Sequence, residues 1–478
     1  MNKQPDVIVV GSGLAGLAAA DILAAKGLNV RVLDDNAHTG GQLLRQFSRG
    51  HARGRFEPDR LKRRGHRLVR RLKTSRVQFD HGVQVLGLFP ERTLLAADQR
   101  GRVTEHRTDA LILATGARER QLPFKGWTLP GVMATGAAQI LMKSSGILPG
   151  RKTMIGGCGP LMLVLAAELL THGGTVQAVM DQSKAAAKLG AVAAVPAIWP
   201  KLLEGAFYLA RLAAARVPMQ QGVRIVEARG RDCLDAVVVA RSDANGRIIP
   251  GTETVCPADA LAVGYGFAPN IELPLQAGCS VSFEVDKGGW IVDVDEAMAT
   301  SLPGIYAAGE PTGIAGAGKS FIEGQLAAWE ILYRRGRVNR RQYNRRTRPL
   351  KRWRNQQVQY GRFLNRWCRL DPACYDDIPD ETIICRCEEI TMVEIRRQLN
   401  NGFTTLNGLK KATRCQMGNC QGRICGPILT DIVSAYAQQS PHLAGCPSAR
   451  APIKPVRLGA LADMETNGGG RLKGGDHH

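Results

Sequence analysis

The chain opens with a short apolar run, and its hydrophobic pattern changes from strand to helix across a glycine turn. Residues 6–10 (DVIVV) have the continuous apolar pattern of a buried strand, and GSGLAG follows at once before the helical run LAAADILAAKG. A second strand is predicted over residues 29–33 (NVRVL), and it leads into Asp34. This order of strand, glycine turn, helix and strand predicts a Rossmann-like dinucleotide-binding unit.

The three glycines of this turn have distinct expected roles. Gly11 permits the tight turn, Gly13 lets a diphosphate approach the backbone, and Gly16 lets the helix pack closely on the strand. Asp34 can accept hydrogen bonds from ribose hydroxyls, and no phosphate-binding arginine accompanies it, which disfavours NADP. A GxGxxG motif alone is a weak signal, but this one stands in the required context.

Later segments indicate that the dinucleotide is FAD. LILATG (111–116) is similar to the segment that flavoproteins fold beside the adenine end of FAD, and IYAAGE (305–310) to the segment at the ribityl chain, although Glu310 stands where most flavoproteins have aspartate. Gly40-Gly41-Gln42 adds a flavoprotein-like turn. The expected cofactor-binding residues of this first site are Gly11, Gly13, Gly16, Asp34, Gly41, Gln42, Val85, Thr115, Gly116, Gly309 and Glu310.

A second unit of strand, turn and helix lies over MIGGCGPLM (154–162). It offers Gly157 and Gly159 as cofactor-binding glycines but has Met162 where the third glycine would stand, and the next strand ends at Asp181. The pattern is that of the second nucleotide domain of two-dinucleotide flavoproteins. NAD, ATP or another adenine nucleotide, and an empty vestigial fold, all remain open. Cys158 has no partner in a CxxC or CxxxxC pair, which disfavours a dithiol mechanism because that needs two neighbouring sulfurs.

Charge and hydropathy narrow the function classes. The net charge of +22 is local: residues 45–76 carry +11 and residues 334–369 carry +14, so the rest of the chain is slightly acidic. No helix-turn-helix or RNA-binding signature accompanies these stretches, so we expect no nucleic-acid binding; a solvated surface and a dock for anionic nucleotides or an acidic partner are the alternatives. No apolar run is long enough to span a bilayer and no secretory signal is evident, which predicts a cytoplasmic protein, with peripheral membrane association through partners as the alternative.

Five cysteines are concentrated in CRCEEI (385–390) and RCQMGNCQGRIC (414–425), within a unit of about sixty residues that is too small for a large core. Thr391 and Glu394 form a capping-box pattern before the first of three predicted short helices. In the reducing cytoplasm the thiols are expected to bind metal rather than form disulfides. Four thiolates can hold zinc or a [2Fe-2S] cluster. Zinc knuckles are usually CxxC pairs, a spacing that this domain lacks. The attachment of the domain to a flavin domain also favours the cluster, which can carry single electrons. The expected ligands are Cys385, Cys387, Cys420 and Cys425, and Cys415 is the spare thiol that could replace Cys420.

The predicted fold class is therefore α/β: a two-dinucleotide-binding flavoprotein fold, in which a Rossmann-like domain carries an inserted second Rossmann-like domain, plus a small C-terminal helical [2Fe-2S] domain. A chain of 478 residues exceeds one ordinary core. The expected segments are the first part of the FAD-binding domain (1–117), the inserted second nucleotide-binding domain (118–280), the second part of the FAD-binding domain (281–333), an Arg-rich connector (334–378), the [2Fe-2S]-binding domain (379–445) and a C-terminal tail (446–478).

The motifs also resemble a known family. CRCEEIT with TRCQMGNCQGRICG resembles the bacterioferritin-associated-ferredoxin-like [2Fe-2S] domain at the C-terminus of several flavoprotein dehydrogenases. Stretches at 118–133, 264–273, 309–327 and 452–462 resemble the large (A or alpha) subunit of opine oxidases, of D-hydroxyproline and dye-linked proline dehydrogenases, and the B subunit of hydrogen cyanide synthase. Glu310 is similar to what that group carries.

The resemblance implies an oxidoreductase that is one subunit of a heteromeric complex. A beta subunit of the D-amino-acid-oxidase type, with its own FAD, would oxidise an amino acid, an opine or another secondary amine, and a small ferredoxin-like subunit is a further candidate partner. This chain would relay the electrons through its own FAD, or an FMN at a subunit interface, and its cluster to a quinone or dye-like acceptor. No catalytic residue is assigned. The alternatives are a stand-alone NAD(P)H-dependent flavoprotein reductase and a nucleotide-bound assembly scaffold with a structural cluster.

Overall fold

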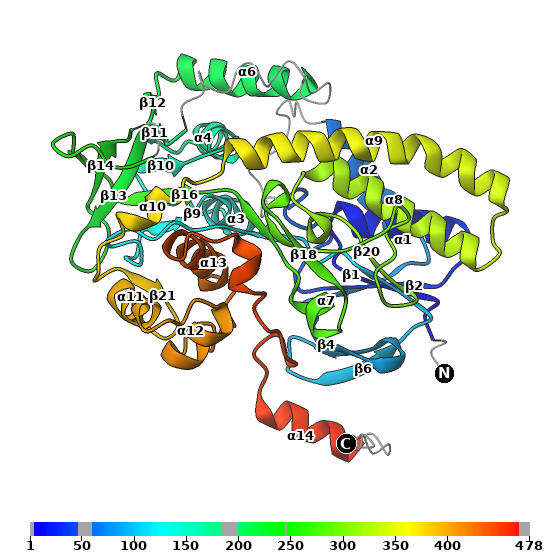
Figure 1. The fold of residues 1–478 in the computed structure, drawn as a ribbon. Coiled ribbons are helices and arrows are strands. Elements are labelled where there is room, and N and C mark those ends of the chain that lie inside the picture. The colour runs from blue at the N-terminus through cyan, green and yellow to red at the C-terminus, as the bar shows by residue number, and fades with distance from the viewer. Residues whose placement is uncertain (1–3, 46–59, 184–198, 244–245, 468–478) are drawn as a thin grey trace.

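The computed structural model describes residues 4–45, 60–183, 199–243 and 246–467, and it confirms the predicted α/β fold class with two Rossmann-like units and a small helical domain (Figure 1). Two five-stranded parallel sheets form the centres of the two units. The first Rossmann-like unit is built from two segments, one before the second unit in the sequence and one after it, and these are the two predicted FAD-binding segments. Within the described ranges, no helix is both long and apolar enough to cross a membrane.

The first sheet has the strand order β20-β7-β1-β2-β3, with all strands parallel. Helices α1 and α8 pack together so closely that a Cβ added at Gly324 would lie 1.9 Å from the carbonyl oxygen of Ala15. The elements of this unit are β1 (Val7–Val10), α1 (Leu14–Ala25), β2 (Val30–Asp34), α2 (Arg60–Lys73), β3 (Gln78–His81), β4 (Gln84–Phe89), β5 (Thr93–Ala97), β6 (Val103–Arg107), β7 (Ala110–Leu113), β20 (Ile305–Ala307) and α8 (Ala317–Arg334).

Two antiparallel strands, β8 (Ala117–Glu119) and β17 (Phe267–Pro269), join the first unit to the second. The second sheet has the order β12-β11-β10-β16-β9 and is also parallel. Its elements, with an antiparallel sheet of three strands, are β9 (Val132–Ala134), α3 (Thr135–Ser145), β10 (Thr153–Gly157), α4 (Leu161–Thr171), β11 (Val176–Asp181), α6 (Trp199–Ala214), β12 (Met219–Gln221), β13 (Val223–Arg229), β14 (Ala236–Arg241), β15 (Thr254–Pro257) and β16 (Ala260–Gly264). The chain returns through α7 (Glu272–Gln276) and the hairpin β18 (Val281–Glu284) and β19 (Gly289–Val292).

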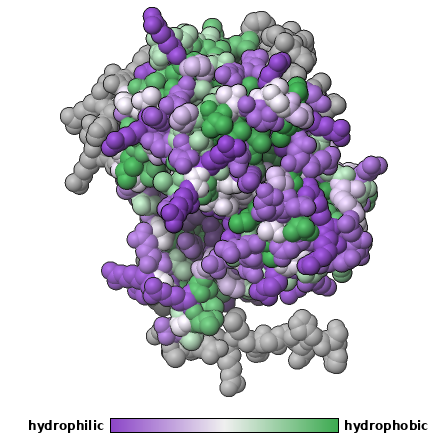
Figure 2. Space-filling view, turned by 90° about the vertical axis from the view of Figure 1, so that its left-hand side faces the viewer, coloured by the Kyte–Doolittle hydropathy of each residue, from purple (hydrophilic) through white to green (hydrophobic). Residues whose placement is uncertain are grey.

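The expected Arg-rich connector contains a helix of 28 residues, α9 (Arg340–Trp367), which begins with a capping box between Asn339 and Gln342. Figure 1 shows α9 running along one side of the molecule beside α8, and Arg354 and Arg366 pair with Glu323 and Asp286 of the first unit. The other basic stretch, 45–76, forms α2 where it is described. Polar side chains cover most of the face shown in Figure 2, with apolar residues exposed in small patches.

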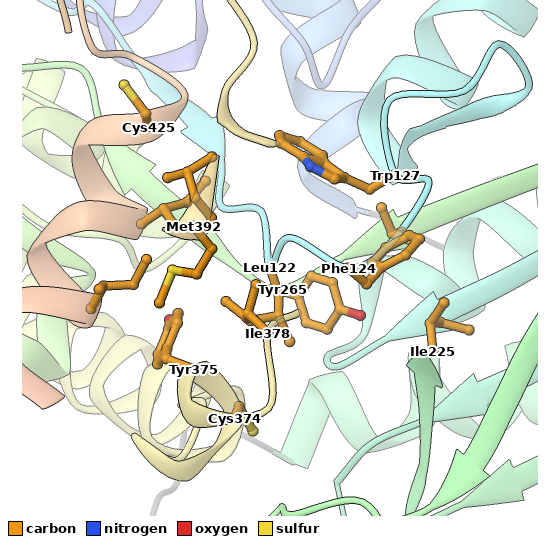
Figure 3. Close-up of a cluster of buried hydrophobic side chains, with 14 of the residues drawn as sticks. Leu122, Phe124, Trp127, Ile225, Tyr265, Cys374, Tyr375, Ile378, Met392 and Cys425 are labelled. Atoms are coloured by element: carbon orange, nitrogen blue, oxygen red, sulfur yellow. The ribbon is translucent and has the colours of Figure 1, made fainter. Parts of the chain in front are cut away.

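The cysteine-rich domain follows the short helix α10 (Ala373–Asp376) and consists of β21 (Ile383–Cys385), β22 (Ile390–Thr391), α11 (Met392–Asn400), α12 (Leu406–Thr413) and α13 (Cys425–Tyr436), and α14 (Leu458–Asn467) lies beyond it. The capping box of Thr391 and Glu394 is confirmed. One buried apolar cluster runs from the second Rossmann-like unit into this domain. Figure 3 shows Phe124 and Tyr265 of that unit, Ile378 of the preceding segment next to Tyr265, and Met392 of the domain beyond it. The two parts therefore share a core rather than meeting at a polar surface.

Candidate functional site

The first glycine turn is closed toward the protein and open on one side. Gly11 has φ of +103°, and a Cβ there would lie 2.3 Å from the carbonyl oxygen of Ala114, so a side chain is excluded. A Cβ at Gly16 would lie 2.0 Å from the oxygen of Gly11. Among the described residues, nothing lies within 4 Å of the place where a Cβ at Gly13 would be. The backbone at Gly13 is thus accessible to a ligand, as a diphosphate site requires.

Asp34 is buried and braces this turn. Its Oδ2 accepts a hydrogen bond from the amide of Ser12 at 2.5 Å, and its Oδ1 accepts one from the amide of Asn36 at 2.7 Å. The predicted flavoprotein-like turn approaches the same place, since a Cβ at Gly41 would lie 2.8 Å from the Cα of Gly13. Gln42, next to it, is exposed. Asp34 and Gly41 therefore lie on either side of the glycine turn.

The predicted adenine-side residues are tied to a residue that the sequence argument did not assign. Asn270 donates from its side-chain nitrogen to the carbonyl of Thr115 at 2.9 Å, and Thr115 Oγ1 donates to the carbonyl of Asn270 at 2.7 Å. Gly116 has φ of +73°, and its Cα also faces open space. Val85, in β4, belongs to the buried apolar cluster that includes Val10. The loop after β7 is thus fixed by the strand that returns from the second unit.

Glu310 fixes the loop that leads into α8. Its two carboxylate oxygens accept hydrogen bonds from the amides of Gly316 at 2.8 Å and Ala315 at 3.1 Å. Burial raises the pKa of Glu310 despite the nearby Lys319. The preceding Gly309 has φ of +88°, a conformation that favours glycine.

A fully buried ion pair beneath this segment was not found from the sequence. Lys319 donates from Nζ to the carbonyl oxygens of Gly309 at 2.7 Å and Gly313 at 2.8 Å, and lies 3.0 Å from the Glu323 carboxylate. Glu323 in turn accepts from the amide of Gly309 at 2.9 Å and from Arg354 Nε at 2.8 Å. Burial lowers the pKa of Lys319; it would raise that of Glu323, but Lys319 and Arg354 hold the latter below its ordinary value. The i,i+4 spacing of Lys319 and Glu323 on a helix was the available signal.

The second glycine turn differs from the first at its second glycine. Gly157 is packed as Gly11 is, because a Cβ there would lie 2.0 Å from the carbonyl oxygen of Gly264. At Gly159, however, a Cβ would lie 2.7 Å from the Sγ of Cys368, which follows α9. Met162, at the third position, is buried in the apolar core beside this turn. The place that is open in the first turn is covered in the second.

All five cysteines of the C-terminal domain come together. The neighbouring thiols of Cys415 and Cys425 lower the pKa of Cys385, and Cys387 has a corresponding side-chain interaction with Cys420. Cys387 is exposed, whereas Cys385, Cys415 and Cys425 are buried. Among the described residues, no group of three or more Cys, His, Asp or Glu side chains is arranged to hold a single metal ion. The sulfurs instead form an inner and an outer group, and two thiolates for each iron is what a [2Fe-2S] cluster requires.

The backbone around these sulfurs is strained in a way that is common at functional sites. Glu389, Arg414, Gln416 and Gln421 all have left-handed φ values, between +49° and +70°. The amides of Gln416 and Glu388 point at Cys385, and the amide of Cys420 points at Cys387. Backbone amides directed at cysteine sulfurs are typical of iron–sulfur sites. The donor set and its surroundings therefore fit a [2Fe-2S] cluster.

A cavity of about 290 Å³ lies between the cysteine-bearing loop and the strands that join the two Rossmann-like units. Met417 and Gln421 of the loop line one side, and Arg118, Phe283 and Trp290 line the other. The Nε of Arg118 and the Nε1 of Trp290 are buried without a hydrogen-bond partner in the part of the chain that is described. The cavity therefore has an aromatic wall of Phe283 and Trp290 with the charged side chain of Arg118 beside it, a combination suited to a planar ligand.

Comparison with known proteins agrees with this geometry. A family model described as "Pyridine nucleotide-disulphide oxidoreductase" matches residues 5–329, and one described as "BFD-like [2Fe-2S] binding domain" matches residues 383–435. The A subunit of opine oxidase from Rhizobium meliloti (strain 1021) is 34% identical over 464 residues, covering 96% of this chain and 98% of the relative. The chain belongs to the pyridine nucleotide-disulphide oxidoreductase family, in the group that contains the A subunits of opine oxidases.

A second relative and a solved structure are similar over nearly the whole chain. Hydrogen cyanide synthase subunit HcnB of Pseudomonas aeruginosa is 33% identical, covering 98% of this chain and all of the relative. The crystal structure of L-proline dehydrogenase from P. horikoshii superposes with a TM-score of 0.68 at 20% identity, covering 96% of this chain and 79% of that one, which supports the fold. The family resemblance and the oxidoreductase class predicted from the sequence are confirmed, and membership implies FAD and a [2Fe-2S] cluster.

Proposed function

We propose that this chain is the FAD- and [2Fe-2S]-binding electron-transfer subunit of a heteromeric dehydrogenase or oxidase that acts on an amino acid, an opine or another secondary amine. The observation that carries the proposal is the shared core: the five-cysteine domain is packed into the flavoprotein part by one buried apolar cluster. Such packing holds a one-electron centre at a fixed distance from the dinucleotide site. A domain that had its own core and was joined only by a flexible linker would not keep this distance fixed.

The chain's own residues then have separate tasks. The open backbone at Gly13, with Asp34 and Gly41 beside it, binds the adenosine diphosphate half of FAD. Gly309 and Glu310 approach its ribityl chain, and the buried Lys319–Glu323 pair holds them in place. When bound, FAD would supply two-electron redox chemistry and the cluster would supply one-electron transfer. Four cysteines hold that cluster: Cys385, Cys387, Cys420 and Cys425.

The substrate reacts on another chain in this proposal. The relatives named above are subunits of opine oxidase and hydrogen cyanide synthase, so we infer a partner here too. A beta subunit of the D-amino-acid-oxidase type, with its own FAD, would oxidise the amine, and a small ferredoxin-like subunit would complete the complex. The basic faces of α2 and α9 offer positive charge to an acidic partner surface.

The cavity beside the cysteine-bearing loop is our candidate site for the next carrier, either FMN at a subunit interface or a quinone or dye-like acceptor. Trp290 and Phe283 provide an aromatic wall, and the charged side chain of Arg118 lies beside it. We expect Trp290→Ala to raise the KM for an artificial dye acceptor several-fold while the flavin and cluster contents of the purified protein stay unchanged. An unchanged KM would remove this cavity from the proposal.

Purification of the complex from its native host tests the function. Mass spectrometry of the purified material should find a flavin-binding partner chain and FAD, and electron paramagnetic resonance should show a reducible [2Fe-2S] signal that appears when an amine substrate is added. Recovery of this chain alone, with one flavin and rapid flavin reduction by NADH, would refute the proposal and favour a stand-alone reductase. A protein without flavin bands would favour the scaffold.

The ligand set needs its own test, because Cys415 and Cys425 both contact Cys385. Cys420→Ser and Cys425→Ser should each abolish the cluster signal, whereas Cys415→Ser should keep it. Cys233→Ser, an exposed cysteine outside this domain, is the matched control. Loss of the signal in Cys415→Ser and its retention in Cys420→Ser would exchange the two assignments.

A further inference from the structure

We propose that the end of α9 and the short helix α10 permanently occupy the second dinucleotide site, so that this chain neither binds NAD(P)H there nor takes electrons from it. Members of a pyridine nucleotide-dependent family are expected to hold that nucleotide on the second glycine turn and at the acid after the next strand. Both places are covered here by residues from the same chain. The inference concerns a site that the proposed function does not use.

The first part of the cover lies on the glycine turn. Gly13 and Gly159 hold equivalent positions in the two motifs. Among the described residues nothing lies within 4 Å of a Cβ at Gly13, whereas the Sγ of Cys368 lies 2.7 Å from where a Cβ of Gly159 would be. The thiol of Cys158 also donates to the carbonyl oxygen of Cys368 at 3.2 Å. The side of the turn that a diphosphate must approach is therefore already in van der Waals contact with protein.

The second part of the cover lies at the end of β11, where a ribose would bind. Trp367 donates from Nε1 to Ser183 Oγ at 3.0 Å, and Ser183 itself donates to the carboxylate of Asp181 at 2.7 Å. The adjacent Gln182 donates from its side chain to the Sγ of Cys374 at 3.1 Å. The residues that would recognise the adenosine end are thus bonded to α9 and α10.

The cover is anchored on its far side as well. Arg224, buried in β13, donates to the carbonyl oxygen of Cys374 at 2.6 Å and to Asp377 at 2.8 Å. Tyr375 donates to Asp431 of α13 at 2.5 Å. Cys374 and Tyr375 belong to the same buried cluster as the cysteine-rich domain, as Figure 3 shows. Lifting the cover would open that core, so it is a fixed part of the fold and not a lid.

This arrangement also accounts for Met162. In the first turn, the third glycine is required because its Cβ would lie 2.0 Å from the oxygen of Gly11. In the second, Met162 lies in the first turn of α4 and is buried among apolar side chains. A turn that holds no diphosphate does not need the close approach of helix and strand that the third glycine provides.

The test uses the purified complex with its flavin bound, so that the first site is already filled. Hydrogen–deuterium exchange is followed in peptides covering residues 153–183, with and without NADH at about 1 mM, the upper end of common enzyme affinities. We expect no change in exchange there and no flavin reduction by NADH. Protection of these peptides by NADH would overturn the proposal, whatever the activity of the complex with amines.

A variant tests whether the cover is the cause. Trp367→Ala combined with Cys368→Gly removes the two side chains at the end of α9 that lie over the site, and Trp353→Ala, at an exposed tryptophan of the same helix, is the control. In the double variant we expect NADH to protect residues 153–183, with binding at least about tenfold tighter than in the parent. A folded double variant that still shows no protection would overturn the assignment of this segment as the occupant. If the double variant does not fold, the result on the parent complex decides.

Discussion

Trp127 donates a hydrogen bond from its indole nitrogen to the carbonyl oxygen of Ile383 at 2.7 Å, two residues before the first cysteine of the cluster domain. The guanidinium of Arg386 lies over the same indole ring, 5.4 Å from its centre. One side chain of the second Rossmann-like unit therefore holds the residues on both sides of Cys385. The position of that sulfur depends on a domain that supplies none of the cluster's cysteines.

This contact predicts that Trp127→Phe, which keeps an aromatic side chain but removes the indole N–H, destabilises the cysteine-rich domain. The carbonyl of Ile383 loses its donor, and we expect the free energy of unfolding to fall by about 1–3 kcal/mol. Thermal denaturation followed by circular dichroism, together with the rate at which visible cluster absorbance is lost, measures the effect. Trp353→Phe should change neither, because Trp353 is 54% exposed. Equal behaviour of the two variants would show that the indole hydrogen bond is unimportant.

The buried pair of Lys319 and Glu323 predicts a large loss of stability when Lys319 is replaced, and a much larger one than at an exposed ion pair. Lys319→Met leaves the buried Glu323 carboxylate with Arg354 as its remaining positively charged partner and removes the donor to Gly309 and Gly313. We therefore expect a loss of about 3–5 kcal/mol in stability and loss of flavin on purification. Chemical denaturation and the flavin-to-protein absorbance ratio measure it.

The matched control is Lys351→Met. Lys351 pairs with Glu296, whose side chain is 80% exposed, so that substitution should cost at most about 1 kcal/mol. A melting temperature of Lys319→Met within a degree or two of the parent would contradict a structural role for the buried pair.

The two glycine turns predict opposite results for the same substitution. Gly13 has φ of −68° and open space at its Cβ position, so Gly13→Ala should fold normally but lose flavin because the new methyl faces the ligand. Gly159→Ala should keep flavin but lower stability by roughly 1–2 kcal/mol, since φ is +102° and the methyl meets Cys368. Flavin content and melting temperature separate the two. Loss of flavin in Gly159→Ala but not in Gly13→Ala would mean that the flavin binds at the second glycine turn and not at the first.

Glu119, in the strand that joins the two units, predicts a pH dependence of stability. Burial raises its pKa from the ordinary 4.5 to about 7, while the amide of Gly136 donates to its carboxylate at 2.8 Å. The folded chain holds this proton more tightly than the unfolded chain. The resulting contribution is fully present below about pH 4.5 and is lost as the pH rises through about 7, a change of no more than roughly 3 kcal/mol.

Glu119→Gln should remove this dependence because the amide side chain does not titrate in this range. Urea denaturation of parent and variant at several pH values between 4.5 and 8 gives the difference. Glu284→Gln, which changes a carboxylate on the β18–β19 hairpin, is the control for general effects of charge. Parallel stability curves for the parent and Glu119→Gln would show that Glu119 is not the group responsible.

The sequence by itself determined the local chemistry. The spacing of Gly11, Gly13 and Gly16 and the strand pattern around them fix a turn of known geometry, because the steric demands of a glycine turn act over a few residues. The capping box at Thr391 follows from the same kind of short-range bonding. The sequence also showed that the cysteines are concentrated in one small domain. The two family models match the flavoprotein part and this cysteine-rich domain.

Only the tertiary structure decided what happens between distant segments. Gly159 and Cys368 are 209 positions apart, and no spacing rule relates them; their contact exists because α9 and the cysteine-rich domain pack onto the second Rossmann-like unit. The hydrogen bonds of Asn270 with Thr115 arise in the same way. Local patterns restrict φ, ψ and spacing, whereas the packing of a shared core selects which distant surfaces meet. That selection, and not the glycine motif, determines which of the two dinucleotide sites is open.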